Sequence, residues 1–215
     1  MNFPVLTVAL TILFGLVSCA APPALTSARN EVGVVCCESF EQLPYRSVVA
    51  NATVRMEIDV GAPSFVFPEG TSRFAAFKLP DGSSSQKVRI KSTIVGTHMP
   101  EAFVFYPGIT FLDDRHKQIQ YLNPKMTFEG SFMGSTESMG WATEIVVPNL
   151  ARYFVLHTAS DSPGRLFYND SVQSPVSSIV PTGRSIIFSP GNWWDVYLPT
   201  SWAGRIQVTL TSTAN

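Results

Sequence analysis

Apolar and polar residues alternate with a period of two along much of this chain. The alternation is clearest in three segments, 54–60, 87–91 and 205–210. In the first, Val54, Met56, Ile58 and Val60 are separated by charged residues. Successive side chains of a strand point to opposite faces, so each segment predicts a strand with one face toward a core and the other toward solvent.

Turn residues divide the rest of the chain into short apolar runs. Further strands are expected at 72–79, 102–106, 109–112, 126–132, 141–147, 152–158 and 184–188. Pro-Gly, Pro-Asn and Pro-Asp-Gly sequences lie between them, and no long segment keeps a helical period. Many short strands separated by Gly and Pro are typical of an all-β sandwich or jelly-roll-like domain. The Ser-rich segment 161–181 is expected to be an excursion between strands and not a second domain.

The N-terminal segment is typical of a secretory signal. The apolar stretch 5–17 is shorter than the roughly 20 residues of a membrane-spanning helix. Leu-Val-Ser-Cys follows, the order of a bacterial lipobox, which predicts a signal peptide over 1–18 and acylation of Cys19, for example with palmitate. Ala20 is not the aspartate that retains lipoproteins at the inner membrane, so we expect a lipid anchor in the outer membrane, facing the periplasm. The alternative is an ordinary cleaved signal with an incidental cysteine, because no Lys or Arg precedes Cys19.

A tether is expected to separate this anchor from the folded part. Segment 19–35 contains Pro22-Pro23 and shows no periodicity, so we interpret it as flexible. The β-sandwich domain is then expected over 36–215. A chain of 215 residues suits one such domain with a leader.

Charge argues against nucleic acid as a partner. Only 14% of the residues are charged, and 15 basic residues face 16 acidic ones. Without a basic excess there is no field to hold a phosphate backbone.

With Cys19 lipidated, two adjacent cysteines remain, Cys36 and Cys37. The periplasm permits disulfides. Consecutive Cα atoms lie about 3.8 Å apart, closer than the roughly 4.4 to 6.8 Å of most disulfides. Three alternatives stay open: buried or partly oxidised structural cysteines, a vicinal disulfide, and a bridge to another molecule.

Signatures of catalysis and of metal binding are missing from the sequence. The histidines, His98, His116 and His157, are scattered, and neither a nucleophile elbow nor a phosphate-binding loop occurs. We therefore expect no enzyme, no metal and no cofactor. His157 ends an apolar run and is interpreted as a hydrogen-bonded structural residue.

Carboxylates also fail to form a recognisable catalytic pair. Asp113 and Asp114 are adjacent, so on a strand they would point to opposite faces. Asp113 is expected to accept backbone hydrogen bonds at a turn. Nothing in their spacing selects a pair among the remaining candidates, Glu57, Glu69, Glu101 and Glu144.

Aromatic residues gather near the C-terminus, and they are the candidate ligand-binding site. Trp193, Trp194, Tyr197 and Trp202 fall close together, with Asp195 among them. Neighbouring tryptophans on a strand face opposite sides, so one core cannot hold both. Core and edge packing is one interpretation. The other is a groove in which the rings stack on sugar rings and Asp195 binds hydroxyl groups.

Four segments carry a family resemblance. The stretch 36–45, Cys-Cys-Glu-Ser-Phe-Glu-Gln-Leu-Pro-Tyr, resembles the opening of the maltose operon periplasmic protein family, and 67–80, 107–113 and 152–158 agree with that family in order. The resemblance implies a periplasmic accessory protein of maltose or maltodextrin transport, and it supplies no catalytic residue. The lipobox departs from the founding type of the family. The rival expectation is an envelope protein-interaction or assembly factor that binds another envelope protein and no sugar.

Overall fold

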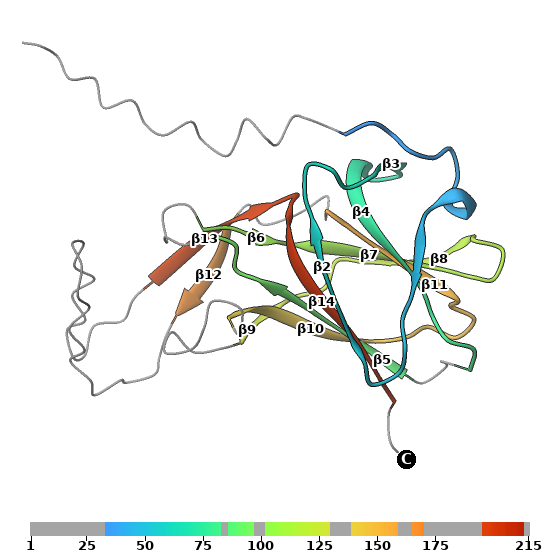
Figure 1. Ribbon diagram of the computed structural model, residues 1–215. Helices are drawn as coiled ribbons and strands as arrows, with labels where there is room; N and C mark the ends of the chain where they lie inside the picture. Colours follow the sequence, from blue (N-terminus) through green and yellow to red (C-terminus); the bar gives the residue numbers. More distant parts are fainter. Residues whose placement is uncertain are drawn as a thin grey trace, which may run out of the picture. The chain divides into compact units, whose positions relative to one another are not determined.

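The computed structural model describes residues 33–82, 86–96, 102–129, 139–158, 165–169 and 195–212 (Figure 1). The chain divides into two compact units, Met1–Glu31 and Val32–Asn215, and all described residues belong to the second. Strands dominate this unit, and the only helical element in its described part is a 3-10 helix, Phe40–Gln42. The all-β prediction is therefore confirmed.

The first sheet has the strand order β1-β4-β11-β7-β8, and β3 also pairs with β4. Its strands are β1 (Tyr45–Ser47), β3 (Ser64–Phe67), β4 (Gly70–Lys78), β7 (Pro107–Leu112), β8 (Gln118–Leu122) and β11 (Tyr153–Thr158). Strand β1 runs parallel to β4, whereas β3 and β11 run antiparallel to it. The parallel pairing requires β1 to be linked to β4 by a long connection, which contains β2 and β3.

The second sheet has the order β2-β14-β5-β10-β9, with all pairs antiparallel. Its strands are β2 (Thr53–Ile58), β5 (Gln86–Thr93), β9 (Thr127–Glu129), β10 (Gly140–Val146) and β14 (Gly204–Ser212). The last strand of the chain, β14, lies between β2 and β5. The sheet is therefore complete only when the C-terminal segment has inserted.

A third, smaller sheet has the order β12-β13-β6. Its strands are β6 (Val104–Phe105), β12 (Arg165–Asn169) and β13 (Asp195–Ser201). Strand β12 falls inside the segment 161–181, which the sequence predicted as an excursion between strands. The backbone of 165–169 is ordered, because it pairs with β13 from Arg165 opposite Pro199 to Asn169 opposite Asp195, and the remainder of 161–181 lies outside the described residues.

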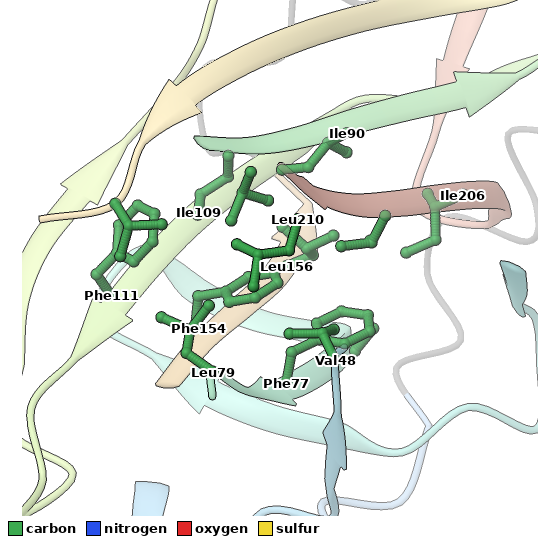
Figure 2. Close-up of a cluster of buried hydrophobic side chains, with 14 of the residues drawn as sticks. Val48, Phe77, Leu79, Ile90, Ile109, Phe111, Phe154, Leu156, Ile206 and Leu210 are labelled. Atoms are coloured by element: carbon green, nitrogen blue, oxygen red, sulfur yellow. The ribbon is translucent and has the colours of Figure 1, made fainter. Parts of the chain in front are cut away.

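The two larger sheets enclose the main hydrophobic core, as expected for a sandwich. Figure 2 shows part of it, with Phe77 from β4, Phe154 from β11 and Ile206 from β14 pointing toward one another. The rings of Phe77 and Phe154 stack with their centroids 4.8 Å apart. Burying one such large apolar side chain stabilises the fold by about 1.5–3 kcal/mol.

The first sheet is buried on its outer face as well. Along β4, Ala75 and Phe77 belong to the main core, whereas Phe74 and Ala76 belong to a second cluster. This outer cluster contains residues of the 36–45 segment, of β3 and of the sheet: Leu43, Phe65, Phe67, Phe74, Ala76, Leu112 and Val155, with Cys37, Phe40, Tyr45 and Tyr153 packed against them. The N-terminal segment of the domain thus covers a sheet face that would otherwise expose apolar side chains.

Several element boundaries differ from the sequence prediction. Strand β2 ends at Ile58, and Val60 is 70% exposed, so the inward alternation does not extend to Val60. Val35 pairs with Ser64 in a parallel bridge, so the folded part begins before Cys36 and the predicted tether 19–35 is too long by at least that residue. The expected strand at 184–188 lies outside the described residues.

Candidate functional site

An open groove of about 540 Å³ lies over the outer cluster of the first sheet. Three segments line it: the start of the domain, strand β3 with its turn, and the tip of the β7–β8 loop. The lining residues are Glu38, Ser39, Phe40, Glu41, Phe65, Val66, Phe67, Pro68, Arg115 and His116. We call this the β3 groove.

Aromatic rings form the apolar part of the β3 groove. The ring of Phe40 lies 5.0 Å from that of Phe65 and 6.1 Å from that of Phe67, measured between centroids. Phe65 and Phe67 alternate with exposed Val66 along β3, so both rings point into the outer cluster. Phe40, which is half-buried, extends this apolar surface toward solvent.

Exposed polar side chains stand on one side of the groove, namely Glu38, Ser39 and Glu41. The backbone of this segment is fixed by hydrogen bonds to side chains of residues that follow it in the chain. The Glu38 N–H donates to the side-chain oxygen of Gln42 at 2.8 Å, and the Tyr45 hydroxyl donates to the Phe40 carbonyl at 2.7 Å. Burial, followed by the neighbouring Tyr153, raises the pKa of Tyr45 well above its ordinary value, so this hydroxyl keeps its proton.

The β7–β8 loop, which Asp113 shapes, also lines the groove. One carboxylate oxygen of Asp113 accepts hydrogen bonds from the N–H groups of Arg115 at 2.9 Å and Lys117 at 2.8 Å. This is the turn role expected for Asp113, and it leaves no free carboxylate pair with Asp114. His116 takes a left-handed backbone conformation, φ 59°, and its ring stacks on Tyr153 with centroids 4.2 Å apart.

The β3 groove therefore combines an apolar ring surface with two carboxylates, a hydroxyl, a guanidinium and an imidazole. Such a concave site with a few polar groups around an apolar floor is suited to hold a small organic ligand. Carboxylates accept hydrogen bonds from hydroxyl groups, and a guanidinium donates to oxygen. Among the residues that the structure describes, no group of three His, Cys, Asp or Glu side chains is arranged to hold a metal ion.

Cys36 and Cys37 precede the groove directly and are joined in a vicinal disulfide. Cys36 is exposed and Cys37 is half-buried against the outer cluster, so the alternative of two buried cysteines is wrong. The Cys36 N–H also donates to the Ser64 carbonyl at 2.9 Å. This hydrogen bond ties the start of the domain to β3, and the disulfide restricts the backbone directly after it.

His157 is 1% exposed and is hydrogen-bonded on both ring nitrogens. One nitrogen lies 3.0 Å from the Thr110 hydroxyl and the other 3.2 Å from the Thr158 carbonyl, so the ring donates to the carbonyl and accepts from the hydroxyl. Its ring also stacks on Phe67 at 3.9 Å. Burial, opposed in part by the Thr158 hydrogen bond, lowers the pKa of His157 to about 4. The structural role expected for His157 is what these contacts show.

The aromatic segment predicted as a ligand site is only partly described. Trp193 and Trp194 lie outside the described residues, and the backbone of Asp195 and Tyr197 belongs to β13. Trp202 is half-buried, and the guanidinium of Arg73 lies 3.7 Å from the centroid of its ring. One face of Trp202 is therefore covered by a cation–π contact and is closed to a sugar ring.

The candidate catalytic glutamates are spread over different parts of the domain. Glu57 pairs with Arg205 at 3.7 Å, and Glu144 pairs with Lys87 at 3.6 Å and Arg89 at 3.7 Å. These ion pairs lie on the outer, solvent-facing side of the second sheet, and Glu101 is outside the described residues. Half-exposed ion pairs of this kind contribute little stability.

Sequence reasoning missed the β3 groove as a site. It predicted neither β1, β3 nor β8, and the groove is built from segments far apart in the chain. Two signals did point to its sides: the Cys-Cys-Glu-Ser-Phe-Glu stretch and the turn aspartate Asp113. The sequence did not show that these two segments lie close together in the fold.

Searches among protein families, curated proteins and solved structures found no match to this chain. In the described part of the chain, no helix is both long and apolar enough to cross a membrane.

Proposed function

We propose that this chain is a non-enzymatic, periplasm-facing lipoprotein, accessory to maltose or maltodextrin transport, and that the β3 groove binds the glycan. The observation that supports this most strongly is the composition of the groove, whose aromatic surface is lined also by the carboxylates of Glu38 and Glu41 and by the guanidinium of Arg115. The resemblance of 36–45 to the maltose operon periplasmic protein family supplies the sugar class.

The chemistry of a glucose unit suits such a groove. One face of the sugar ring is apolar and can pack on Phe40, while its edge carries hydroxyl groups. Those hydroxyls donate to the carboxylates of Glu38 and Glu41 and accept from Arg115. A phosphorylated or acidic ligand would be opposed by the two carboxylates, so a neutral glycan fits better.

The groove replaces the segment from Trp193 to Trp202 as the first candidate surface. Trp202 has one ring face occupied by Arg73, and Trp202 does not line the β3 groove. Stacking by Trp193, Trp194 and Tyr197, with hydrogen bonding by Asp195, remains a prediction that a substitution at Trp194 can test separately.

Calorimetric titration of the full chain with maltoheptaose tests the proposal. Glu41→Gln removes the charge of a hydrogen-bond acceptor and Arg115→Gln removes the guanidinium donor, and each should weaken binding by about tenfold, or about 1.4 kcal/mol. Glu57→Gln is the matched control, because this exposed glutamate lies on the second sheet and away from the groove. An absence of heat and of any thermal shift at about 10 mM sugar would rule out the glycan assignment.

A second function, docking of another envelope protein, is favoured by the free edge of the first sheet. Strand β8 ends the described order of that sheet, and its Ile119 is 40% exposed. An edge strand can accept a strand from a partner, and a lysine on such an edge prevents this pairing. Affinity purification after crosslinking, with and without maltodextrin, separates the two functions. A sugar-independent partner that is lost with Ile119→Lys would favour docking.

The anchor is a separate part of the proposal. We place it at Cys19, with the bilayer as the partner and the outer membrane as the location. Metabolic labelling with a palmitate analogue should mark the wild-type chain and not Cys19→Ser. Label retained by Cys19→Ser would contradict an anchor at this residue.

A further inference from the structure

The side of the β3 groove that carries Glu38 and Glu41 has little structural support of its own. Its 3-10 helix spans only Phe40–Gln42, buries none of its residues and has no side-chain hydrogen bond at its N-cap, Ser39. So short a helix is not stable in isolation. Its position therefore comes from the packing of Phe40 on the rings of Phe65 and Phe67 and from the residues that flank the helix.

Cys37 supplies the fixed point on the N-terminal flank. Its side chain packs against the outer cluster. Its sulfur also lies 3.5 Å from the Gln42 carbonyl oxygen, and this is a contact without a hydrogen bond, because a disulfide sulfur carries no proton. The preceding residue, Cys36, is held to β3 through its N–H on the Ser64 carbonyl. The disulfide joins these two attachments in one small ring, and Glu38 follows at once.

The two cysteines differ in their exposure to solvent. Cys36 is exposed, whereas Cys37 is half-buried. A thiolate from outside can therefore reach the Cys36 sulfur and expel Cys37 as the leaving group, since thiol–disulfide exchange depends on access to the sulfur that is attacked.

We propose that the Cys36–Cys37 disulfide is a redox latch for the β3 groove, a form of regulation that rests on the proposed function. When closed, it holds the Glu38–Glu41 side of the groove in the binding position. A dithiol opens it: one thiolate attacks the Cys36 sulfur, the Cys36–Cys37 bond breaks, and Cys37 leaves as a thiolate and takes up a proton. The second thiol of the reductant then displaces Cys36. Two electrons and two protons pass to the cysteines, and the dithiol becomes a disulfide.

Opening the latch leaves the sandwich untouched, because the main core contains neither cysteine. The peptide bond still links the β3 attachment at Cys36 to Cys37, but the small ring that restricts rotation between these two residues is gone. The amides of Gln42, Leu43 and Tyr45, which donate within this segment, then lose part of their protection. Glycan affinity falls as amide protection falls, because the carboxylates of the groove are no longer held in place.

Hydrogen exchange and calorimetry on the same samples test the latch. The full chain carrying Cys19→Ser has only this cysteine pair, since the sequence contains three cysteines. Dithiothreitol should raise exchange at the Gln42, Leu43 and Tyr45 amides by about tenfold or more while leaving those of Ile206 and Val208 unchanged. Maltoheptaose affinity should fall by about tenfold. The further variant Cys36→Ser/Cys37→Ser should behave as the reduced form and not respond to dithiothreitol.

The outcomes separate the latch from the glycan assignment. Sugar binding and amide protection that are both unaffected by reduction would overturn the latch and leave the groove assignment standing. Protection that falls on reduction, in a chain that binds no sugar in either state, would support the latch and refute the glycan. Equal loss of protection at Ile206 and Val208 would mean general unfolding and would also overturn the latch.

Discussion

The buried His157 should make the stability of the domain depend on pH between 5 and 7. Its pKa is about 4 in the folded chain, against about 6.5 for an unperturbed histidine. Over this range the unfolded chain therefore binds more protons than the folded one, so stability rises with pH and is lost as pH falls. The two pKa values give a loss of about 2 kcal/mol between pH 7 and pH 5 from this residue alone.

Replacement of His157 by Gln isolates this contribution. The amide can donate to the Thr158 carbonyl or accept from the Thr110 hydroxyl, but it does not titrate. We expect a loss of about 1–3 kcal/mol at pH 7, because the stacking on Phe67 and one hydrogen bond are weakened. The variant should then lose less stability than the wild type on going to pH 5, by about 2 kcal/mol.

Urea unfolding followed by circular dichroism at pH 5, 6 and 7 measures both quantities. The matched control is His116→Gln, which removes another histidine, half-buried at the groove, and so separates the effect of His157 from that of losing any histidine. If His157→Gln and the wild type lost equal stability from pH 7 to pH 5, the assignment of a neutral, buried imidazole would be refuted.

Three further substitutions test the packing. Gly140→Ala should destabilise the domain by about 2–4 kcal/mol or prevent folding, because a Cβ there would lie 2.2 Å from the Ser92 carbonyl oxygen. Thermal denaturation of the variant measures this loss. Phe154→Ala should cost about 3–5 kcal/mol in chemical denaturation, since its ring is fully buried in the main core, and a loss below 1 kcal/mol would contradict that packing. Asp113→Ala should cost about 1 kcal/mol and weaken maltoheptaose binding while Asp114→Ala does neither, because only Asp113 holds the groove loop by two backbone hydrogen bonds.

The period-two pattern was sufficient to predict most strands of the second sheet. Strands β2, β5 and β14 each have one solvent-facing side, so Val54, Ile90 and Val208 alternate with polar residues in a way that the sequence displays directly. The all-β class followed from these segments and from the turns between them.

The strands that the sequence missed do not show this alternation over a sufficient length. Strand β8 has no fully buried residue, β1 has three residues, and β3 alternates only over Ser64–Phe67. Strand β4 was predicted, but not its burial on both faces, because its run Phe74 to Phe77 is apolar throughout. Period alone cannot show that a second layer covers the outer face of a sheet.

The same outer layer explains why the candidate site escaped prediction. Residues 36–45 cover the first sheet only because β3 and the parallel strand β1 bring them there, and strand neighbours are not encoded in a period-two pattern. The aromatic cluster near Trp202 was conspicuous in the sequence, and of its rings only that of Trp202 lies in the described side chains, where it packs on Arg73. Ligand binding by Trp193, Trp194 and Tyr197 stays a prediction.

Both sides of the β3 groove are fixed by local covalent or hydrogen-bonded devices, and this bears on its function. On one side the Asp113 carboxylate closes the loop that presents Arg115, and on the other the Cys36–Cys37 ring precedes Glu38. A surface that served only to cover the sheet would need the apolar residues beneath, Phe65 and Phe67, but no rigid polar sides. Fixing polar groups before a ligand arrives lowers the entropy lost on binding. The Asp113 turn and the cysteine ring are therefore the features that the proposed glycan binding would require of the groove.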